Sequence, residues 1–219
     1  MDTITEPPGD TTTNTRFQPV QVTAHLSTAV INLDTHPPHL DAPVSWGAYQ
    51  AYIATHGHNS LPPMTNEHAV DFALPLATWE HDGVWGWTCS RAHYEAAGYT
   101  TLAMRRRPAV DQMARLAKDK KHHLAAGPMK ARDTPLPATL VNQVTWYALA
   151  DPDPLRHLLN RVWSLGRLGR HGHGRITHWE VDTHHNRDAW KDRTMPHSNG
   201  TLQGIRAPYH HQTRKVPAC

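Results

Sequence analysis

The densest group of chemically useful residues in this chain is a glycine-rich basic segment, residues 165–175, which we call the glycine-rich loop. Glycine adopts positive φ angles at little steric cost, so it lets a backbone lie close to a ligand. Backbone N–H groups and arginine side chains both bind anions, which makes the loop a candidate cradle for phosphates, with RNA as the expected ligand. A solvated connection is the plainer alternative, and it is disfavoured because no acidic residue lies between Asp153 and Glu180. The candidate contacts are Gly166, Arg167, Gly169, Arg170, His171, Gly172, His173, Gly174 and Arg175.

A second basic region lies in residues 100–137, where the periodic pattern of the chain is interrupted. An excursion of this length inside a compact domain is usually either functional or disordered. Its basic side chains favour a contact with a nucleic acid, and a solvated insertion is the alternative. The candidate contacts are Arg105, Arg106, Arg107, Lys118, Lys120, Lys121 and Lys130.

Nineteen histidines make general acid–base chemistry available, but no spacing among them is diagnostic. Metal-independent cleavage of RNA needs a base for the 2′-hydroxyl, an acid for the leaving oxygen and a cation on the phosphate. His25, His39, His171 and His173 are candidates for these roles, and none is assigned as a catalytic residue. The cysteines, Cys89 and Cys219, follow no ligand pattern, so we expect neither a metal nor another cofactor.

The composition indicates a polar globular protein with an anionic partner. Of 219 residues, 38% are hydrophobic, and the net charge is +3 with neutral histidines. The acids are enriched towards the N-terminus and the bases towards the middle, which favours a polyanion on one surface. Two cysteines imply no disulfide framework, and no apolar run approaches the roughly 20 residues of a membrane span. We therefore expect a cytoplasmic protein that makes no membrane contact.

Alternating and helical periodicities predict the elements that position the two basic regions. Asp82-Gly83 between apolar alternations predicts a hairpin turn. Pro152 and Pro154 with two acids predict the start of a helix whose buried face includes Trp163. Trp85 and Trp87 are interpreted as a core pair, with a stacking platform as the alternative. The predicted strands are residues 20–33, 72–79, 84–91, 140–149 and 176–181, and the predicted helices are residues 42–55 and 153–165.

This order of elements predicts an α+β fold with a split βαβ arrangement, as in ferredoxin-like and RNA-recognition-motif domains. Three parts are expected along the chain. Residues 1–19 form a disordered arm, because they have little to bury. Residues 20–183 form the domain, with the basic insertion at about residues 100–137. Residues 184–219 form an irregular extension that packs on the domain or on a partner.

Several short motifs, taken in order, resemble those of the RAMP proteins of CRISPR-Cas systems, in which a glycine-rich loop joins the last helix to the last strand. The order is most similar to that of the Cas-five-like Csf family subunit of type IV effector complexes. The resemblance covers about residues 20–209. The motifs are Val22-Thr23-Ala24-His25-Leu26, Pro38-His39-Leu40-Asp41, Lys130, Val144-Thr145-Trp146-Tyr147-Ala148, Asp151, Leu158-Leu159, Trp190-Lys191-Asp192-Arg193-Thr194-Met195-Pro196 and Ala207-Pro208-Tyr209.

The resemblance implies an RNA-binding subunit of a ribonucleoprotein that defends against viruses and plasmids. Such a subunit binds and caps the 5′ handle of the guide RNA, and a thumb-like insertion grips the RNA beside the backbone subunit. The implied partners are the guide RNA, the backbone RAMP subunit and the large subunit, and target DNA stays open as a further partner of Arg105–Arg107. A metal-independent endoribonuclease that processes precursor guide RNA is the alternative function.

Overall fold

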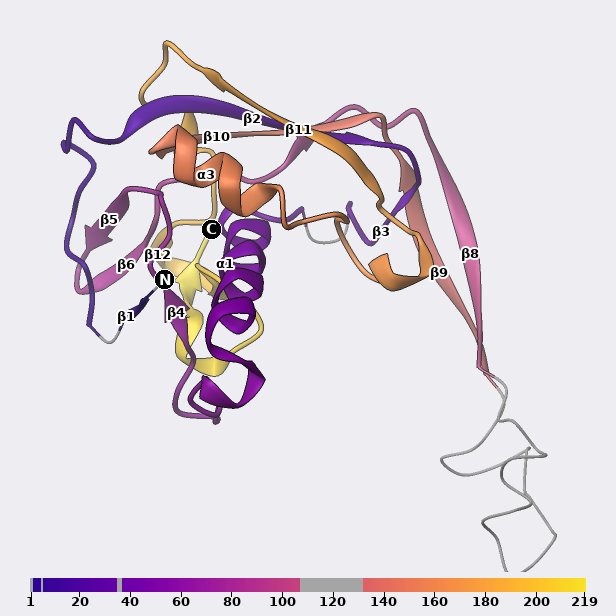
Figure 1. Cartoon of the computed structure of the whole chain (residues 1–219), viewed down its shortest axis with the longest axis horizontal. Helices are drawn as coiled ribbons and strands as arrows, with labels where there is room; N and C mark the ends of the chain where they lie inside the picture. Colours follow the sequence, from indigo (N-terminus) through magenta and orange to yellow (C-terminus); the bar gives the residue numbers. More distant parts are fainter. Residues whose placement is uncertain (1, 5, 35–36, 107–131) are drawn as a thin grey trace, which may run out of the picture.

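The centre of the protein is a four-stranded antiparallel sheet with the strand order β11-β2-β10-β7 (Figure 1). The computed structural model describes residues 2–4, 6–34, 37–106 and 132–219. Strands β2 and β10 pair over eight residues, from Gln143 opposite His25 to Ala150 opposite Gln18. The sheet strands are β2 (Gln18–Leu26), β7 (His93–Tyr94), β10 (Gln143–Ala150) and β11 (Ile176–Thr183).

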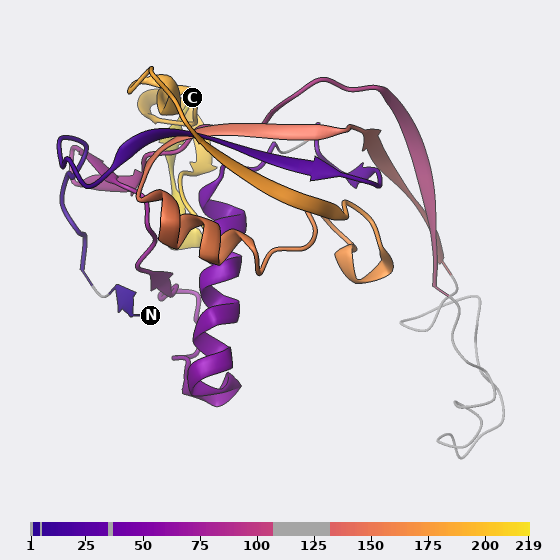
Figure 2. The ribbon, with the colours of Figure 1, turned by 45° about the horizontal axis from the view of Figure 1, so that its top comes forward.

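Two α-helices in the described part of the chain, α1 (Asp41–His56) and α3 (Pro152–Leu159), lie on the same side of this sheet (Figures 1 and 2). Pro152 occupies the first turn of α3, where its missing N–H has no cost, and three leucines at helical spacing face the sheet. The two helices are in close contact at Gly47 of α1, which has no Cβ; a Cβ there would lie 2.4 Å from the carbonyl oxygen of Leu158 in α3. Neither helix is long and apolar enough to cross a membrane.

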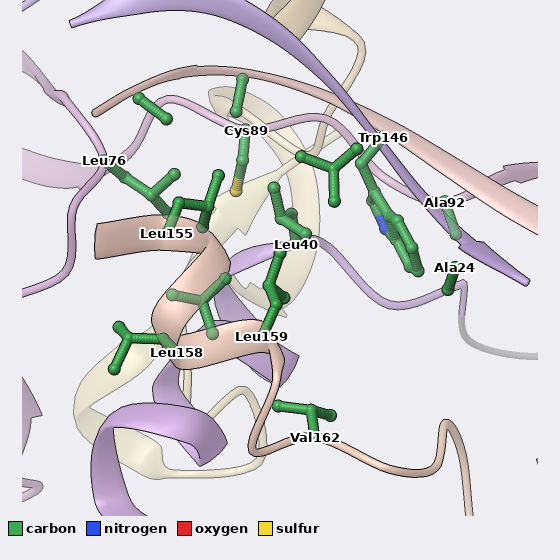
Figure 3. Packing of buried hydrophobic residues seen from close by; sticks show 14 of the residues in the cluster. Ala24, Leu40, Leu76, Cys89, Ala92, Trp146, Leu155, Leu158, Leu159 and Val162 are labelled. Carbon is green, nitrogen blue, oxygen red and sulfur yellow. The ribbon is translucent and has the colours of Figure 1, made fainter. Parts of the chain in front are cut away.

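The main core fills the space between the helices and the sheet (Figure 3). Trp146 of β10 is fully buried there, and its indole Nε1 donates a hydrogen bond of 2.8 Å to the carbonyl of Pro38. Trp85 and Trp87 are buried too, with their rings edge to face at 5.5 Å. The interpretation of these two tryptophans as core residues is therefore confirmed, and they form no open platform.

A long hairpin of β8 (Gly98–Arg106) and β9 (Arg132–Leu140) projects away from the body of the protein (Figures 1 and 2). Its strands pair from Gly98 opposite Leu140 to Arg106 opposite Arg132, and β9 also pairs with β3 (Val30–Ile31). The ends of the predicted insertion are therefore regular strands. Its remainder, residues 107–131, lies outside the described residues.

The smaller elements complete the α+β fold as two-stranded antiparallel sheets and short 3-10 turns. The predicted hairpin turn is confirmed, because His81 pairs with Val84 and both Asp82 and Gly83 have positive φ. The remaining strands are β1 (Thr3–Ile4), β4 (Asp71–Phe72), β5 (Thr78–His81), β6 (Val84–Trp87), β12 (Pro196–Gly204) and β13 (Lys215–Ala218). The 3-10 turns are η1 (His58–Ser60), η2 (Gly169–His171), η3 (Ala189–Lys191) and η4 (Gln212–Arg214).

The structure departs from the sequence prediction at both ends of the chain. Where a disordered arm is expected, β1 pairs with β4, and Arg187 donates hydrogen bonds to backbone carbonyls of the arm. Where an irregular extension is expected, β12 and β13 form a hairpin, and Ala218 of β13 belongs to a second small core with Trp190 and Leu149. In both segments, backbone partners distant in sequence supply an order that the local composition does not reveal.

Several predicted elements have different bounds in the structure. The predicted strand 20–33 is two strands, β2 and β3, and residues 27–29 between them are in no strand. The predicted strand 72–79 is likewise divided between β4 and β5, and the predicted strand 84–91 ends at Trp87. The predicted helix 153–165 ends at Leu159, so Trp163 lies beyond the helix, and its side chain is 53% exposed rather than buried.

A buried polar cluster attaches the C-terminal extension to α1. The carboxylate of Asp41, fully buried, accepts hydrogen bonds from the backbone N–H of Ala207, at 2.9 Å, and from the Tyr209 hydroxyl. Arg193 donates to the backbone carbonyls of Trp87 and Cys89. Three of the motifs that carry the family resemblance therefore meet in one buried cluster.

His39 belongs to the same cluster, stacked on the Tyr209 ring with centroids 5.1 Å apart. Burial, reinforced by the nearby Arg193 guanidinium, lowers the pKa of His39 to about 4. The imidazole is therefore neutral at pH 7, and its Nε2 accepts a hydrogen bond from the backbone N–H of Thr194.

Candidate nucleic-acid interface

The glycine-rich loop lies between the end of α3 and the start of β11, beside the middle of the strands β8 and β9 (Figure 1). Its ends are joined by hydrogen bonds, because the Leu165 N–H donates to the Gly174 carbonyl and the Ile176 N–H to the Trp163 carbonyl. Thr28, in the connection between β2 and β3, holds the loop in place: its hydroxyl donates to the Gly172 carbonyl at 2.9 Å and accepts from the Arg175 N–H at 2.8 Å.

Three of the four glycines lie against other atoms of the folded chain with no room for a Cβ. A Cβ on Gly174 would lie 1.9 Å from the Leu165 carbonyl oxygen, and one on Gly166 would lie 2.8 Å from that of Ile31. A Cβ on Gly169 would lie 2.0 Å from the Ser164 hydroxyl, whereas one on Gly172 would meet no atom within 4 Å. The glycines therefore shape the loop, and three of them, Gly166, Gly172 and Gly174, have the positive φ angles that glycine allows.

Leu168 anchors the middle of the loop. It has a left-handed φ of 61° and packs against Leu136, Ala138 and Ile31 of the hairpin's sheet. The arginines of the loop, Arg167, Arg170 and Arg175, are all exposed.

The electrostatic character of the loop follows from the absence of acids. Within the described residues, Arg167, Arg170 and Arg175 form no ion pair. Across the same described part of the chain, the backbone N–H groups of residues 166–170 donate no hydrogen bond to a protein acceptor. Side-chain cations and backbone donors are thus both available to an anion such as a phosphate.

The structure brings part of the second basic region to the loop. Arg105 of β8 lines a pocket of about 230 Å³ together with His171 and His173 of the loop. Arg105 also faces Asp133 across the hairpin, with its Nε 3.6 Å from a carboxylate oxygen. Arg106 ends β8, and its backbone pairs with that of Arg132. Five predicted contacts lie outside the described residues: Arg107, Lys118, Lys120, Lys121 and Lys130.

On its other side the loop borders a more apolar pocket of about 510 Å³ that the sequence analysis missed. Its walls include Trp46 of α1, Trp163 and Leu165, together with Gly169 and Arg170 of the loop. Trp46 falls within the predicted helix 42–55, and Trp163 is predicted on the buried face of the helix 153–165. Only the exposure of a side chain in the folded protein distinguishes such tryptophans from core residues. The loop is therefore flanked by an aromatic pocket and a histidine–arginine pocket.

The helix-free face of the sheet carries a second group of polar rings. His25 of β2 stacks on His178 of β11 with ring centroids 4.0 Å apart, and its Nε2 lies 3.2 Å from a carboxylate oxygen of Glu180. Further along this face, Tyr147 and His93 border a hollow of about 810 Å³. The described residues contain no cluster of three or more histidines, cysteines or carboxylates arranged to hold a metal ion.

Comparison with known proteins gives one family. The sequence matches the family described as CRISPR type IV associated protein Csf3 over residues 18–219. No curated protein matches the chain significantly.

Proposed function

The chain belongs to the Csf3 family of CRISPR type IV associated proteins, and we propose that it is the RNA-binding subunit of a type IV effector ribonucleoprotein. In this role it binds and caps the 5′ handle of the guide RNA. The observation that carries the proposal is the glycine-rich loop, where three exposed arginines without acidic partners lie beside Arg105 of the hairpin. Single-stranded RNA is bound through its phosphates by such positively charged surfaces.

The strand order supports a ferredoxin-like core of the RAMP type. Counting only the sheet strands, the first, β2, lies between the fourth, β11, and the third, β10, and the second, β7, lies at the edge. All three pairings are antiparallel, and both helices cover one face. This is the arrangement expected of a split βαβ domain with one helix after its first strand and one after its third.

The projecting hairpin supports the proposed contact with the backbone subunit. β8 and β9 extend beyond the sheet and hold Arg105 next to the loop, so RNA bound at the loop continues along the hairpin. The backbone subunit would meet the protein there, and the large subunit is the second proposed protein partner. Target DNA is a further candidate ligand of the hairpin arginines.

The test is to express the protein with the other subunits encoded beside its gene, purify the complex and sequence its RNA. The proposal expects guide RNA with a protected 5′ handle, lost when this protein is omitted. A complex that assembles and protects the same 5′ end without this protein would contradict it.

One cluster favours a second candidate function, metal-independent cleavage of precursor guide RNA. His25, His178 and Glu180 place two imidazoles and a carboxylate together on the helix-free face. An imidazole pair supplies the base and the acid that such cleavage needs. Incubating the isolated protein with a repeat RNA in a chelator tests this function: cleavage that is lost in His25→Ala and His178→Ala supports it, and an intact RNA rejects it.

A further inference from the structure

The exposure of the tryptophans is uneven. All eight are in the described part of the chain, and five of them are buried. Trp46 and Trp163 are 49% and 53% exposed, and both line the apolar pocket beside the glycine-rich loop. Exposure of a large aromatic side chain to water is energetically unfavourable. Two such side chains around one pocket therefore indicate a binding surface.

The two indoles are held in place by their surroundings. The Trp46 ring stacks on Tyr49, one turn later in α1, with centroids 5.1 Å apart and an interplanar angle of 25°. The backbone of Trp163 is fixed by its hydrogen bond from Ile176, and its ring end lies beside Gly169, close to where a Cβ would be. The pocket is thus preformed, which reduces the entropy lost when a ligand binds.

The pocket and the loop share residues. Gly166, Gly169 and Arg170 belong to the lining of the pocket and also to the backbone segment whose N–H groups are available to a phosphate. A ligand that places an anion on this segment therefore brings the next chemical group of its chain to the tryptophans. In a single-stranded nucleic acid that group is a base, and every base has a π face that stacks on aromatic side chains.

We propose that the pocket between Trp46 and Trp163 receives one unstacked nucleobase of the RNA whose phosphates lie on the glycine-rich loop. This inference rests on the proposed RNA-binding function and assigns the loop a second, uncharged recognition element. A nucleobase suits the pocket better than an apolar protein segment because its lining includes a cation: Arg170 is exposed there and forms no ion pair within the described residues.

The test measures binding of the full chain to two fluorescent probes by anisotropy: a short single-stranded RNA of mixed sequence, and an oligomer of the same length without bases. Trp46→Ala and Trp163→Ala should each weaken binding of the RNA about tenfold or more, since base–aromatic stacking has about that value. Neither should change binding of the abasic oligomer. The conservative variants Trp46→Phe and Trp163→Phe should retain most of the affinity. Leu202→Ala is the matched control, since Leu202 is an apolar residue 65% exposed on β12.

Each outcome separates this inference from the function on which it rests. If the protein binds RNA through its arginines but the tryptophan variants bind as tightly as the original, the base pocket is rejected and the proposed function stands. If neither probe binds, both are rejected. If the tryptophan variants bind RNA normally but no longer enter the effector complex, the pocket contacts a protein subunit and the inference is wrong. A 2-aminopurine scan of the RNA should also find a position whose fluorescence is quenched only when both tryptophans are present.

Discussion

Gly172→Ala and Gly174→Ala provide a matched test of how the glycine-rich loop is built. Both glycines have positive φ, 87° and 61°, so alanine at either position has the same unfavourable left-handed backbone, which costs about 1–2 kcal/mol. Only their surroundings differ. The new Cβ meets open space at Gly172, whereas at Gly174 it would lie 1.9 Å from the Leu165 carbonyl oxygen.

The magnitude of the difference follows from the hydrogen bonds that this overlap disrupts. Gly174 donates to the Ala29 carbonyl and accepts from the Leu165 N–H, both at 2.8 Å. If the loop moves to relieve the overlap, these two bonds are lost, at about 1 kcal/mol each. We therefore expect Gly174→Ala to be about 2 kcal/mol less stable than Gly172→Ala. In a chain of this length, that corresponds to a melting temperature roughly 4–8 °C lower.

Thermal unfolding followed by circular dichroism, with urea titration as a second probe, measures this difference. The two variants also differ in RNA binding, since only Gly174→Ala displaces the strand of the loop that carries Arg175. Equal melting temperatures for the two variants would refute the conclusion that the loop's own packing requires Gly174.

Three further predictions follow from the buried and exposed charges. The pKa of His39 is about 4 in the folded protein and near 6.5 in the unfolded chain, so the unfolded chain takes up the proton first as the pH falls. The free energy of unfolding should therefore fall by about 3 kcal/mol between pH 6.5 and pH 4. Chemical unfolding at several pH values should show this loss, and the loss should be smaller in His39→Gln. Asp71 pairs with Arg214 at 2.7 Å and with Arg206 at 3.6 Å, and burial raises the pKa of its carboxyl although both arginines oppose the shift. Asp71→Ala leaves both arginines without their carboxylate and should lower the free energy of unfolding in urea by about 3–5 kcal/mol. The matched change Asp188→Ala, in an exposed ion pair, should lower it by at most about 1 kcal/mol. Arg105→Ala should leave the melting temperature unchanged and reduce the salt dependence of RNA binding, as log K against log salt, by about 0.7, the value of one phosphate contact in single-stranded RNA.

The parts of the fold that sequence predicts well are those controlled by neighbouring residues. Asp82-Gly83 fixes its hairpin turn because both positions need positive φ. Pro152 and the leucines that follow it predict α3 for the same local reason, but the apolar spacing continues past Leu159, where the helix ends. Trp163 was consequently placed in the core, since spacing alone does not show where a helix stops.

The parts that sequence reasoning missed depend on contacts between distant segments. Asp41 lies in the first turn of α1, but its carboxylate accepts hydrogen bonds from the distant residues Ala207 and Tyr209. The aromatic pocket likewise joins Trp46 to Trp163, which are over 100 residues apart. The sequence predicts a loop between α3 and β11, but its glycines are explained by atoms of Ile31 and Leu165 that only the folded chain brings near them.

The most direct test of the account is the salt dependence of RNA binding in the variant with Arg167, Arg170 and Arg175 all replaced by alanine. If each arginine neutralises one phosphate, the slope of log K against log salt should fall by about 2, because each contact contributes about 0.7. The control replaces three exposed cations that pair with aspartates, Arg16, Arg91 and Lys191, and so removes the same charge elsewhere. We expect only the loop variant to bind RNA more weakly and to show the smaller slope of log K against log salt. Equal losses in the two variants, or none in either, would contradict the loop as the phosphate-binding site.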